Sequence, residues 1–207
     1  MAKKTEKRIL KAALSCFNES GYFHVTLQQI ANAADMSVGN LAYHFPNKLS
    51  ILSVLMEDWI TQWQLLLTDL HLTPIFDNLN KFLQATYSVQ KEYQFIYTDQ
   101  LALIRKYEAM KNHFQDYFQS HHNQLEILME LYLARGVVDQ RGQSIDYIAK
   151  RVRRAMDNWV RHQLIEGNRD LTMDVFLTGI WTEMSYYLTA TGQAEYQELT
   201  ALKQLNR

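Results

Sequence analysis

The chain has 207 residues, of which 47% are hydrophobic and 21% are charged. This composition supplies a packed core and excludes a disordered chain. Its 7 glycines and 2 prolines are too few for a β-sandwich or barrel, which needs a turn about every 8 to 12 residues. The composition therefore predicts an all-α fold of one or two domains.

Charge is distributed unevenly along the chain. Residues 1–50 carry 6 basic and 3 acidic side chains, whereas the remainder carries 15 basic and 19 acidic ones. A small basic module attached to an acidic body is predicted.

The single cysteine, Cys16, excludes an internal disulfide and any CxxC metal or redox motif. Lys7, Arg8 and Lys11 interrupt the apolar residues of the first segment, which is not the pattern of a signal peptide. No stretch approaches the ~18 apolar residues of a membrane span. We expect a soluble, cytoplasmic protein without membrane association.

Two helices are predicted at the start of the chain. Apolar residues at helical spacing indicate an amphipathic helix over residues 4–20 that ends at Gly21. Thr26 and Gln29 have the spacing of a capping box, in which each side chain satisfies a backbone amide of the other residue. A short second helix over 27–34 should follow.

Two more helices are predicted before residue 71. Ser37 can cap a short third helix over 38–44, which Pro46 prevents from continuing. Asn47 can cap a fourth helix with an apolar stripe of more than five turns. We expect this fourth helix to be the mechanical connection between the basic module, residues 1–48, and the body, residues 49–207.

The rest of the chain is predicted to be helical as well, with no strand. The expected helices cover residues 75–90, 93–105, 108–135, 145–166, 172–190 and 194–204. Glycines are expected at the joints, where they end helices: Gly136, Gly142, Gly167 and Gly192.

The second and third helices meet the requirements of a helix-turn-helix DNA reader. Ala31 and Ala34 are small where the two helices must cross, and Ile30, Leu41 and Phe45 are apolar on the inward side. The third helix would then present its outer face to a major groove of duplex DNA.

Candidate DNA contacts follow from the side chains around that helix. Gly39 permits close backbone approach, and Asn40 can form two hydrogen bonds with an adenine edge. The candidates at the amino end of the helix, suited to base edges, are Ser37, Val38, Gly39 and Asn40. The candidates with hydrogen-bond donors for phosphate oxygens are Thr26, Tyr43, His44 and Lys48.

The segment from Arg8 to Leu52 resembles the DNA-binding domain of the tetracycline-repressor (TetR) family of bacterial regulators. The matching motifs are GY at 21–22, VT at 25–26, IA at 30–31, S-x-G at 37–39, YHF at 43–45 and NK at 47–48. The resemblance implies an N-terminal three-helix domain joined by a long helix to a C-terminal bundle that dimerises. It also implies a ligand-responsive regulator, most simply a repressor, that a small effector releases from DNA.

The resemblance also assigns roles to individual residues. It places Gln28, Val38, Gly39 and Asn40 at base-facing positions, and Thr26, Ser37, Tyr43, His44 and Lys48 at phosphate-facing positions. One departure is Ala42, where the family usually has an aromatic residue; its methyl group could still contact a thymine methyl.

Homodimerisation is expected through the helices at 145–166 and 172–190. Gly179 and Ser185 would allow close approach, and Val175, Trp181 and Leu188 would supply apolar cover. Two-fold symmetry predicts an inverted-repeat operator with half-sites about 34 to 36 Å apart, or a multiple of that.

The body is rich in aromatic residues, most of which must form ordinary core. Trp63, Tyr97, Tyr107 and Trp159 are candidate walls of an effector pocket, which favours an apolar or aromatic effector.

The sequence patterns also bear on a metal site and on catalysis. His113, Asp116, His121 and His122 recur near helical spacing, but without an HExxH pattern they favour a solvated helix surface over a metal site. No cofactor is expected, and the absence of GxSxG, P-loop and Glu-x-x-His motifs argues against an enzyme. A helical small-molecule-binding protein without regulated DNA binding stays open as the alternative.

Overall fold

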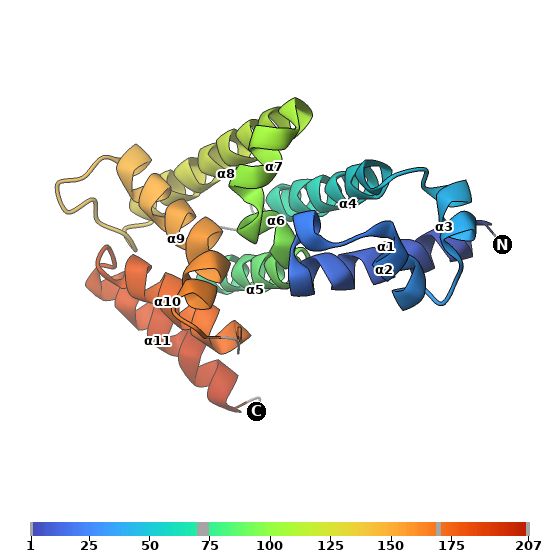
Figure 1. The fold of residues 1–207 in the computed structure, drawn as a ribbon. Coiled ribbons are helices and arrows are strands. Elements are labelled where there is room, and N and C mark those ends of the chain that lie inside the picture. The colour runs from blue at the N-terminus through green and yellow to red at the C-terminus, as the bar shows by residue number, and fades with distance from the viewer. Residues whose placement is uncertain (1, 70–74, 169–170, 206–207) are drawn as a thin grey trace. The chain divides into compact units, whose positions relative to one another are not determined.

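The computed structural model describes residues 2–69, 75–168 and 171–205, and its regular elements are helices, as predicted (Figure 1). Among these residues the one pairing of extended backbone is an isolated antiparallel bridge between Val138 and Leu188. No helix in the described part of the chain combines the length and apolarity needed to cross a membrane.

The first part of the chain forms four α-helices and one 3₁₀ turn. They are α1 (Ala2–Ser20), η1 (Tyr22–His24), α2 (Leu27–Ala33), α3 (Val38–His44) and α4 (Lys48–Asp69). The remaining helices are α5 (Phe76–Glu92), α6 (Gln94–Thr98), α7 (Gln100–Lys106), α8 (Glu108–Ala134), α9 (Ile145–Ile165), α10 (Met173–Ser185) and α11 (Ala190–Leu205).

The predicted caps of the first helices are present. The Thr26 N–H donates to Gln29 Oε1 at 2.8 Å and the Gln29 N–H donates to Thr26 Oγ1 at 3.3 Å, which completes the capping box of α2. Ser37 Oγ accepts from the Asn40 N–H at 3.2 Å at the start of α3. These bonds satisfy backbone amides that a short helix would otherwise leave unpaired.

One predicted helix is divided in the structure, and another ends early. The segment expected as one helix over 93–105 is broken at Asp99 into α6 and α7. The helix expected over 172–190 ends at Ser185, and α11 begins at Ala190. At the first break the Asp99 side chain accepts from the Tyr22 N–H. After α10 the backbone pairs with the segment that follows α8, where the Asp139 N–H donates to Tyr187 O.

The expectation that Gly192 ends a helix is wrong, because it lies in the first turn of α11. A Cβ at this position would lie 2.1 Å from the carbonyl oxygen of Val137. Gly192 therefore permits close backbone packing. By contrast, Gly136 and Gly167 follow α8 and α9 with φ of +70° and +82°, as expected of helix-ending glycines.

The chain forms two compact units. Unit 1 comprises residues 1–62 and 89–111, and unit 2 comprises residues 63–88 and 112–207. Helices α4, α5 and α8 each contribute residues to both units. The fourth helix is therefore one of three helical connections, not the only one, and the functional division at residues 48 and 49 stays a prediction.

The helix-turn-helix segment is built on a buried apolar face of α1. Ile9, Ala13 and Phe17 are fully buried, as are Ile30 of α2 and Leu41 of α3. The spacing of the three α1 residues places them on one face of that helix. The predicted inward positions of α2 and α3 are therefore core positions.

Candidate nucleic-acid interface

Helix α3 presents polar side chains outward, as predicted for a recognition helix. Ser37, Gly39 and Asn40 are exposed and Val38 is half-buried, while Leu41 holds the helix to the core. A Cβ at Gly39 would meet nothing within 4 Å, so this glycine leaves open space on the surface. The amino end of α3 is thus accessible to a groove.

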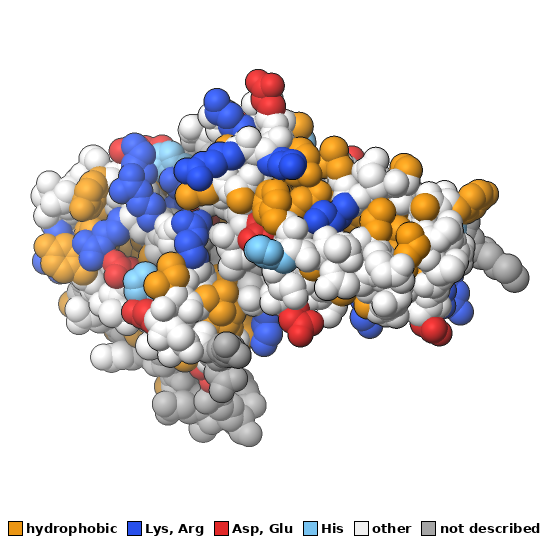
Figure 2. Space-filling view, in the orientation of Figure 1, with side chains coloured by type: hydrophobic (Ala, Val, Ile, Leu, Met, Phe, Trp, Pro, Cys, Tyr) orange, Lys and Arg blue, Asp and Glu red, His pale blue; other side chains and the backbone are white. Residues whose placement is uncertain are grey.

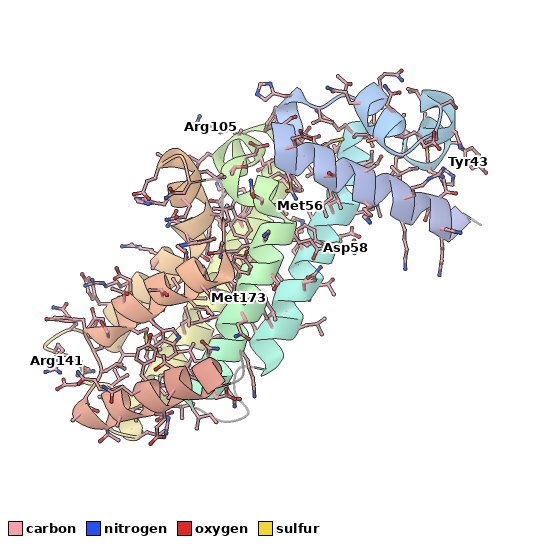
Figure 3. The ribbon with its side chains drawn as sticks, turned by 90° about the horizontal axis from the view of Figure 1, so that it is seen from below. Tyr43, Met56, Asp58, Arg105, Arg141 and Met173 are labelled. Carbon is pink, nitrogen blue, oxygen red and sulfur yellow. The ribbon has the colours of Figure 1, made fainter. Side chains whose placement is uncertain are left out.

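Tyr43 lies on the exposed side of the same helix. Its side chain is 85% exposed and projects from α3 into solvent (Figure 3). A large aromatic residue this exposed contributes nothing to the core of the protomer. Its phenol is accessible, and the phosphate contact of Tyr43 stays a prediction.

Helix α2 contributes two exposed candidates, Thr26 and Gln28. The hydroxyl of Thr26 already serves the capping box. The Gln28 side-chain amide donates to Asn32 Oδ1 at 2.8 Å along the helix surface. An amide has a second N–H donor and a carbonyl oxygen, so this bond is compatible with a base contact, and the base-facing role of Gln28 stays a prediction.

His44 is turned toward α1. Its side chain is 10% exposed, and its Nδ1 lies 3.5 Å from Glu6 Oε1. Its ring also packs edge-on against Tyr43, with ring centroids 5.3 Å apart. The phosphate role of His44 stays a prediction, and the structure adds a link between α3 and α1.

The geometry of Lys48 does not support the predicted phosphate contact. Lys48 Nζ donates to the carbonyl oxygens of Tyr22 and Val25, both at 2.7 Å, and lies 4.4 Å from the centroid of the Tyr22 ring. Two of the three N–H donors of the ammonium group thus serve these carbonyls, and the ring contact is a cation–π interaction. Burial, with Lys106 nearby, lowers the pKa of Lys48. Lys48 therefore anchors the turn before α2.

Positive charge comes from α1 rather than from α2 or α3. Figure 2 shows few charged side chains over α2 and α3, and neither helix contains lysine or arginine. The exposed basic residues of α1 are Lys3, Lys4, Lys7, Arg8 and Lys11. Phosphate neutralisation by this helix would supply the nonspecific part of DNA affinity.

A set of hydrogen bonds that the sequence analysis missed ties α1 and η1 to α6 and α7. Asp99 Oδ2 accepts from the Tyr22 N–H at 2.6 Å, and the Tyr22 and Tyr107 hydroxyls lie 2.9 Å apart. Asn18 donates to the Glu92 carbonyl at 2.7 Å and accepts from the Phe95 N–H at 3.0 Å. Burial and the Tyr107 hydroxyl raise the pKa of Tyr22. No local pattern signals these pairs, because their partners are 74 to 85 residues apart.

The four predicted pocket residues are divided between the units. Tyr97 and Tyr107 belong to unit 1, where Tyr97 accepts from Trp59 Nε1 at 3.1 Å and Tyr107 pairs with Tyr22. Trp63 and Trp159 belong to unit 2 and are buried. Their role as effector walls stays a prediction.

Within the ranges that the structure describes, His113, Asp116, His121 and His122 do not bring their ligand atoms into one group. His121 is fully buried, whereas His113 is half-buried and Asp116 is exposed. Among the described residues, His122, Glu126 and Asp146 bring their ligand atoms within 4.8 Å of one another. Lys150 Nζ already lies 2.7 Å from Asp146 Oδ1, so this group is a salt-bridged cluster.

Comparison with known proteins identifies the family. Residues 9–55 match the profile of bacterial regulatory proteins of the tetR family, and residues 64–196 match that of a TetR bacterial transcriptional repressor. The chain belongs to the TetR family. The first match covers α2 and α3 together with most of α1, where the sequence resemblance lay.

Curated relatives match this TetR-family chain over its N-terminal part. The HTH-type transcriptional regulator RutR of Escherichia coli K12 is 37% identical over 59 residues, which are 27% of this chain and 28% of RutR. TtgW of Pseudomonas putida, a HTH-type transcriptional regulator, is 40% identical over 55 residues, 27% of this chain and 41% of TtgW. The match thus spans less than half of either relative.

Solved TetR-family structures share the fold of the whole chain. A TetR-family regulator from Marinobacter aquaeolei has a TM-score of 0.79 at 20% identity, covering 98% of both chains. SmeT, the repressor of a multidrug efflux pump of Stenotrophomonas maltophilia, has a TM-score of 0.62 at 17% identity, covering 89% of this chain and 91% of SmeT. A SmeT–triclosan complex has a TM-score of 0.60 at 19% identity, covering 90% and 93%.

Proposed function

We propose that this chain is a ligand-responsive transcriptional repressor that binds an inverted-repeat operator as a homodimer and works in the cytoplasm without catalysis. A small apolar or aromatic effector releases it from DNA. The observation that carries the proposal is the helix-turn-helix of unit 1, in which buried Leu41 fixes α3 while Asn40 and Tyr43 face solvent.

The division of labour in the module supports sequence-specific binding. The proposed base-facing residues are Val38, Gly39 and Asn40, at the amino end of α3, and Gln28 of α2. Thr26, Ser37 and Tyr43 are the exposed phosphate-facing candidates, with His44 largely covered. Double-stranded DNA is therefore the proposed macromolecular partner.

The exposed face of α10 supports the proposed homodimer. Val175 is 48% exposed, and a Cβ at Gly179 would meet nothing within 4 Å. Ser185 is exposed on the same helix. Trp181 and Leu188 are buried in unit 2, so the prediction that they cover a partner is wrong.

Release by an effector requires that the effector bind the DNA-incompetent state more tightly. SmeT, which shares this fold, has been solved in complex with triclosan. Helices α4, α5 and α8 contribute to both compact units, so each can transmit a rearrangement of unit 2 to the module.

Selection of bound duplexes from a random DNA pool by the full chain tests the proposal. An inverted repeat, with an affinity that falls steeply with salt, is expected. Recovery of no enriched sequence, with small-molecule binding retained, would instead support a binding protein without regulated DNA binding.

A further inference from the structure

The core of unit 2 contains a buried polar cluster centred on Asp157 of α9. Asp157 is 6% exposed and accepts a hydrogen bond from the Tyr117 hydroxyl of α8 at 2.8 Å. Arg153, one turn away, donates to its other oxygen at 2.8 Å. A carboxylate in such a place needs a compensating charge, and Arg153 provides it.

His121 adjoins this cluster but is not satisfied by it. The side chain is fully buried, and its Nδ1 lies 3.4 Å from Asp157 Oδ1. Neither ring nitrogen has a hydrogen-bond partner among the described residues. An unpaired buried polar group destabilises the fold and calls for an explanation, such as a bound molecule.

The two nitrogens of His121 have different surroundings. Asp157 Oδ1 lies 3.4 Å from Nδ1 and favours the neutral tautomer with its proton on Nδ1, which leaves a lone pair on Nε2 at the opposite edge of the ring. Nε2 then requires a hydrogen-bond donor. A molecule that satisfies it must present an O–H or N–H group.

Aromatic rings surround the same imidazole. The ring centroids of Trp63, Tyr117 and Phe82 lie 5.2, 5.5 and 6.0 Å from that of His121. Thr86 lies one helical turn from Phe82 on α5, hence on the same side of that helix. Thr86 is also fully buried, and its Oγ1 has no partner in the described structure.

We propose that the effector is an uncharged aromatic compound whose hydroxyl or ring N–H donates a hydrogen bond to His121 Nε2, with Thr86 Oγ1 as a second polar contact. The inference rests on the proposed function, since it names the ligand class of that regulator. An anionic ligand fits less well, because Arg153 already balances Asp157 and a second negative charge would be uncompensated.

Matched compounds test the required donor. The full chain is titrated without DNA with three sets: phenol, anisole and benzoate; 2-naphthol, 2-methoxynaphthalene and 2-naphthoate; 4-phenylphenol, 4-methoxybiphenyl and biphenyl-4-carboxylate. In at least one set the hydroxyl compound should bind at least about tenfold more tightly than its ether, because a tenfold change in affinity corresponds to about one hydrogen bond. It should also bind more tightly than its carboxylate. Binding by no hydroxyl compound, or tightest binding by the carboxylates, would overturn the proposal.

Matched variants locate the contact. His121→Phe should lose the preference for hydroxyl over ether, and its melting temperature without ligand should be unchanged or higher, because the unpaired nitrogens are gone. His113→Phe, a half-buried histidine of the same helix, is the control and should keep the preference. A His121→Phe chain with a lower melting temperature and the wild-type preference would show that His121 is only structural.

Thr86→Val is a second, nearly isosteric variant. It should weaken binding of the hydroxyl compound without lowering the melting temperature, since it too removes an unpaired buried atom. Unchanged binding would remove Thr86 from the site. Because these titrations contain no DNA, a chain that binds the hydroxyl compound through His121 but selects no operator would preserve this inference and refute the proposed function.

Discussion

Asp99, at the break between α6 and α7, accepts a 2.6 Å hydrogen bond from the backbone N–H of Tyr22. Gly21, with φ of +79°, allows the approach, since a Cβ there would lie 3.2 Å from Asp99 Oδ2. This hydrogen bond joins the turn between α1 and α2 to the junction of α6 and α7. The two segments are thus held together by more than the chain that runs between them through α4 and α5.

Asp99→Ala should lower both stability and operator affinity. The substitution leaves the buried amide of Tyr22 without its acceptor, which costs about 1 to 3 kcal/mol. Urea unfolding and operator titration would measure the two effects. Asp77→Ala is the control, because its ion pair with Lys81 is exposed and should contribute less than about 1 kcal/mol.

Lys48→Met should lower stability by about 1 to 3 kcal/mol, because it removes a donor from the carbonyls of Tyr22 and Val25. The salt dependence of operator binding should change little. Lys7→Ala, on the exposed face of α1, should instead flatten the log–log salt slope by about 0.9 if it neutralises a phosphate. If the Lys48→Met variant instead flattened the log–log salt slope by about one unit, the predicted phosphate contact of Lys48 would be supported.

Asn40→Ala should relax the sequence preference at one base pair of each half-site and weaken the binding free energy for the preferred operator by about 1 to 3 kcal/mol. Tyr43→Phe should lower the affinity for all DNA sequences about equally, because a phosphate contact does not distinguish one base from another. Both side chains are exposed, so the fold should persist. Selection from a random pool compares the preferences, and an unchanged Asn40→Ala preference would exclude Asn40 from base recognition.

Val175→Glu should convert the proposed homodimer into monomers, since it places charge on the exposed face of α10. Sedimentation at micromolar concentration gives the oligomeric state. Leu101→Glu, at a 60% exposed position of α7, is the control and should stay dimeric. A dimer that survives Val175→Glu would place the interface elsewhere.

Gly192→Ala should destabilise the protein by about 1 to 3 kcal/mol, although alanine favours helices. The added methyl would meet the Val137 carbonyl oxygen at 2.1 Å, and backbone cannot yield as a flexible side chain does. Thr191→Ala, at the exposed neighbouring position, should change stability by less than about 0.5 kcal/mol. Calorimetry distinguishes the two, and a more stable Gly192→Ala chain would contradict the close packing.

Local features of this chain were predictable because their partners are close in sequence. Thr26 and Gln29 cap α2 across three residues, and the apolar spacing of Ile9, Ala13 and Phe17 marks the buried face of α1. The outward face of α3 could be predicted for the same reason, since it depends on residues within one short helix. The helix-turn-helix, its candidate base contacts and the all-α class follow from such short-range patterns.

Only the tertiary structure decided the features whose partners are distant. The carbonyls that hold Lys48 lie 23 and 26 residues before it, and Asp99 lies 77 residues beyond Tyr22. Gly192 reads as a helix stop until packing against Val137 shows why a side chain is excluded. Composition and spacing specify which faces are apolar, but a polar side chain takes its role from the partner that folding brings to it.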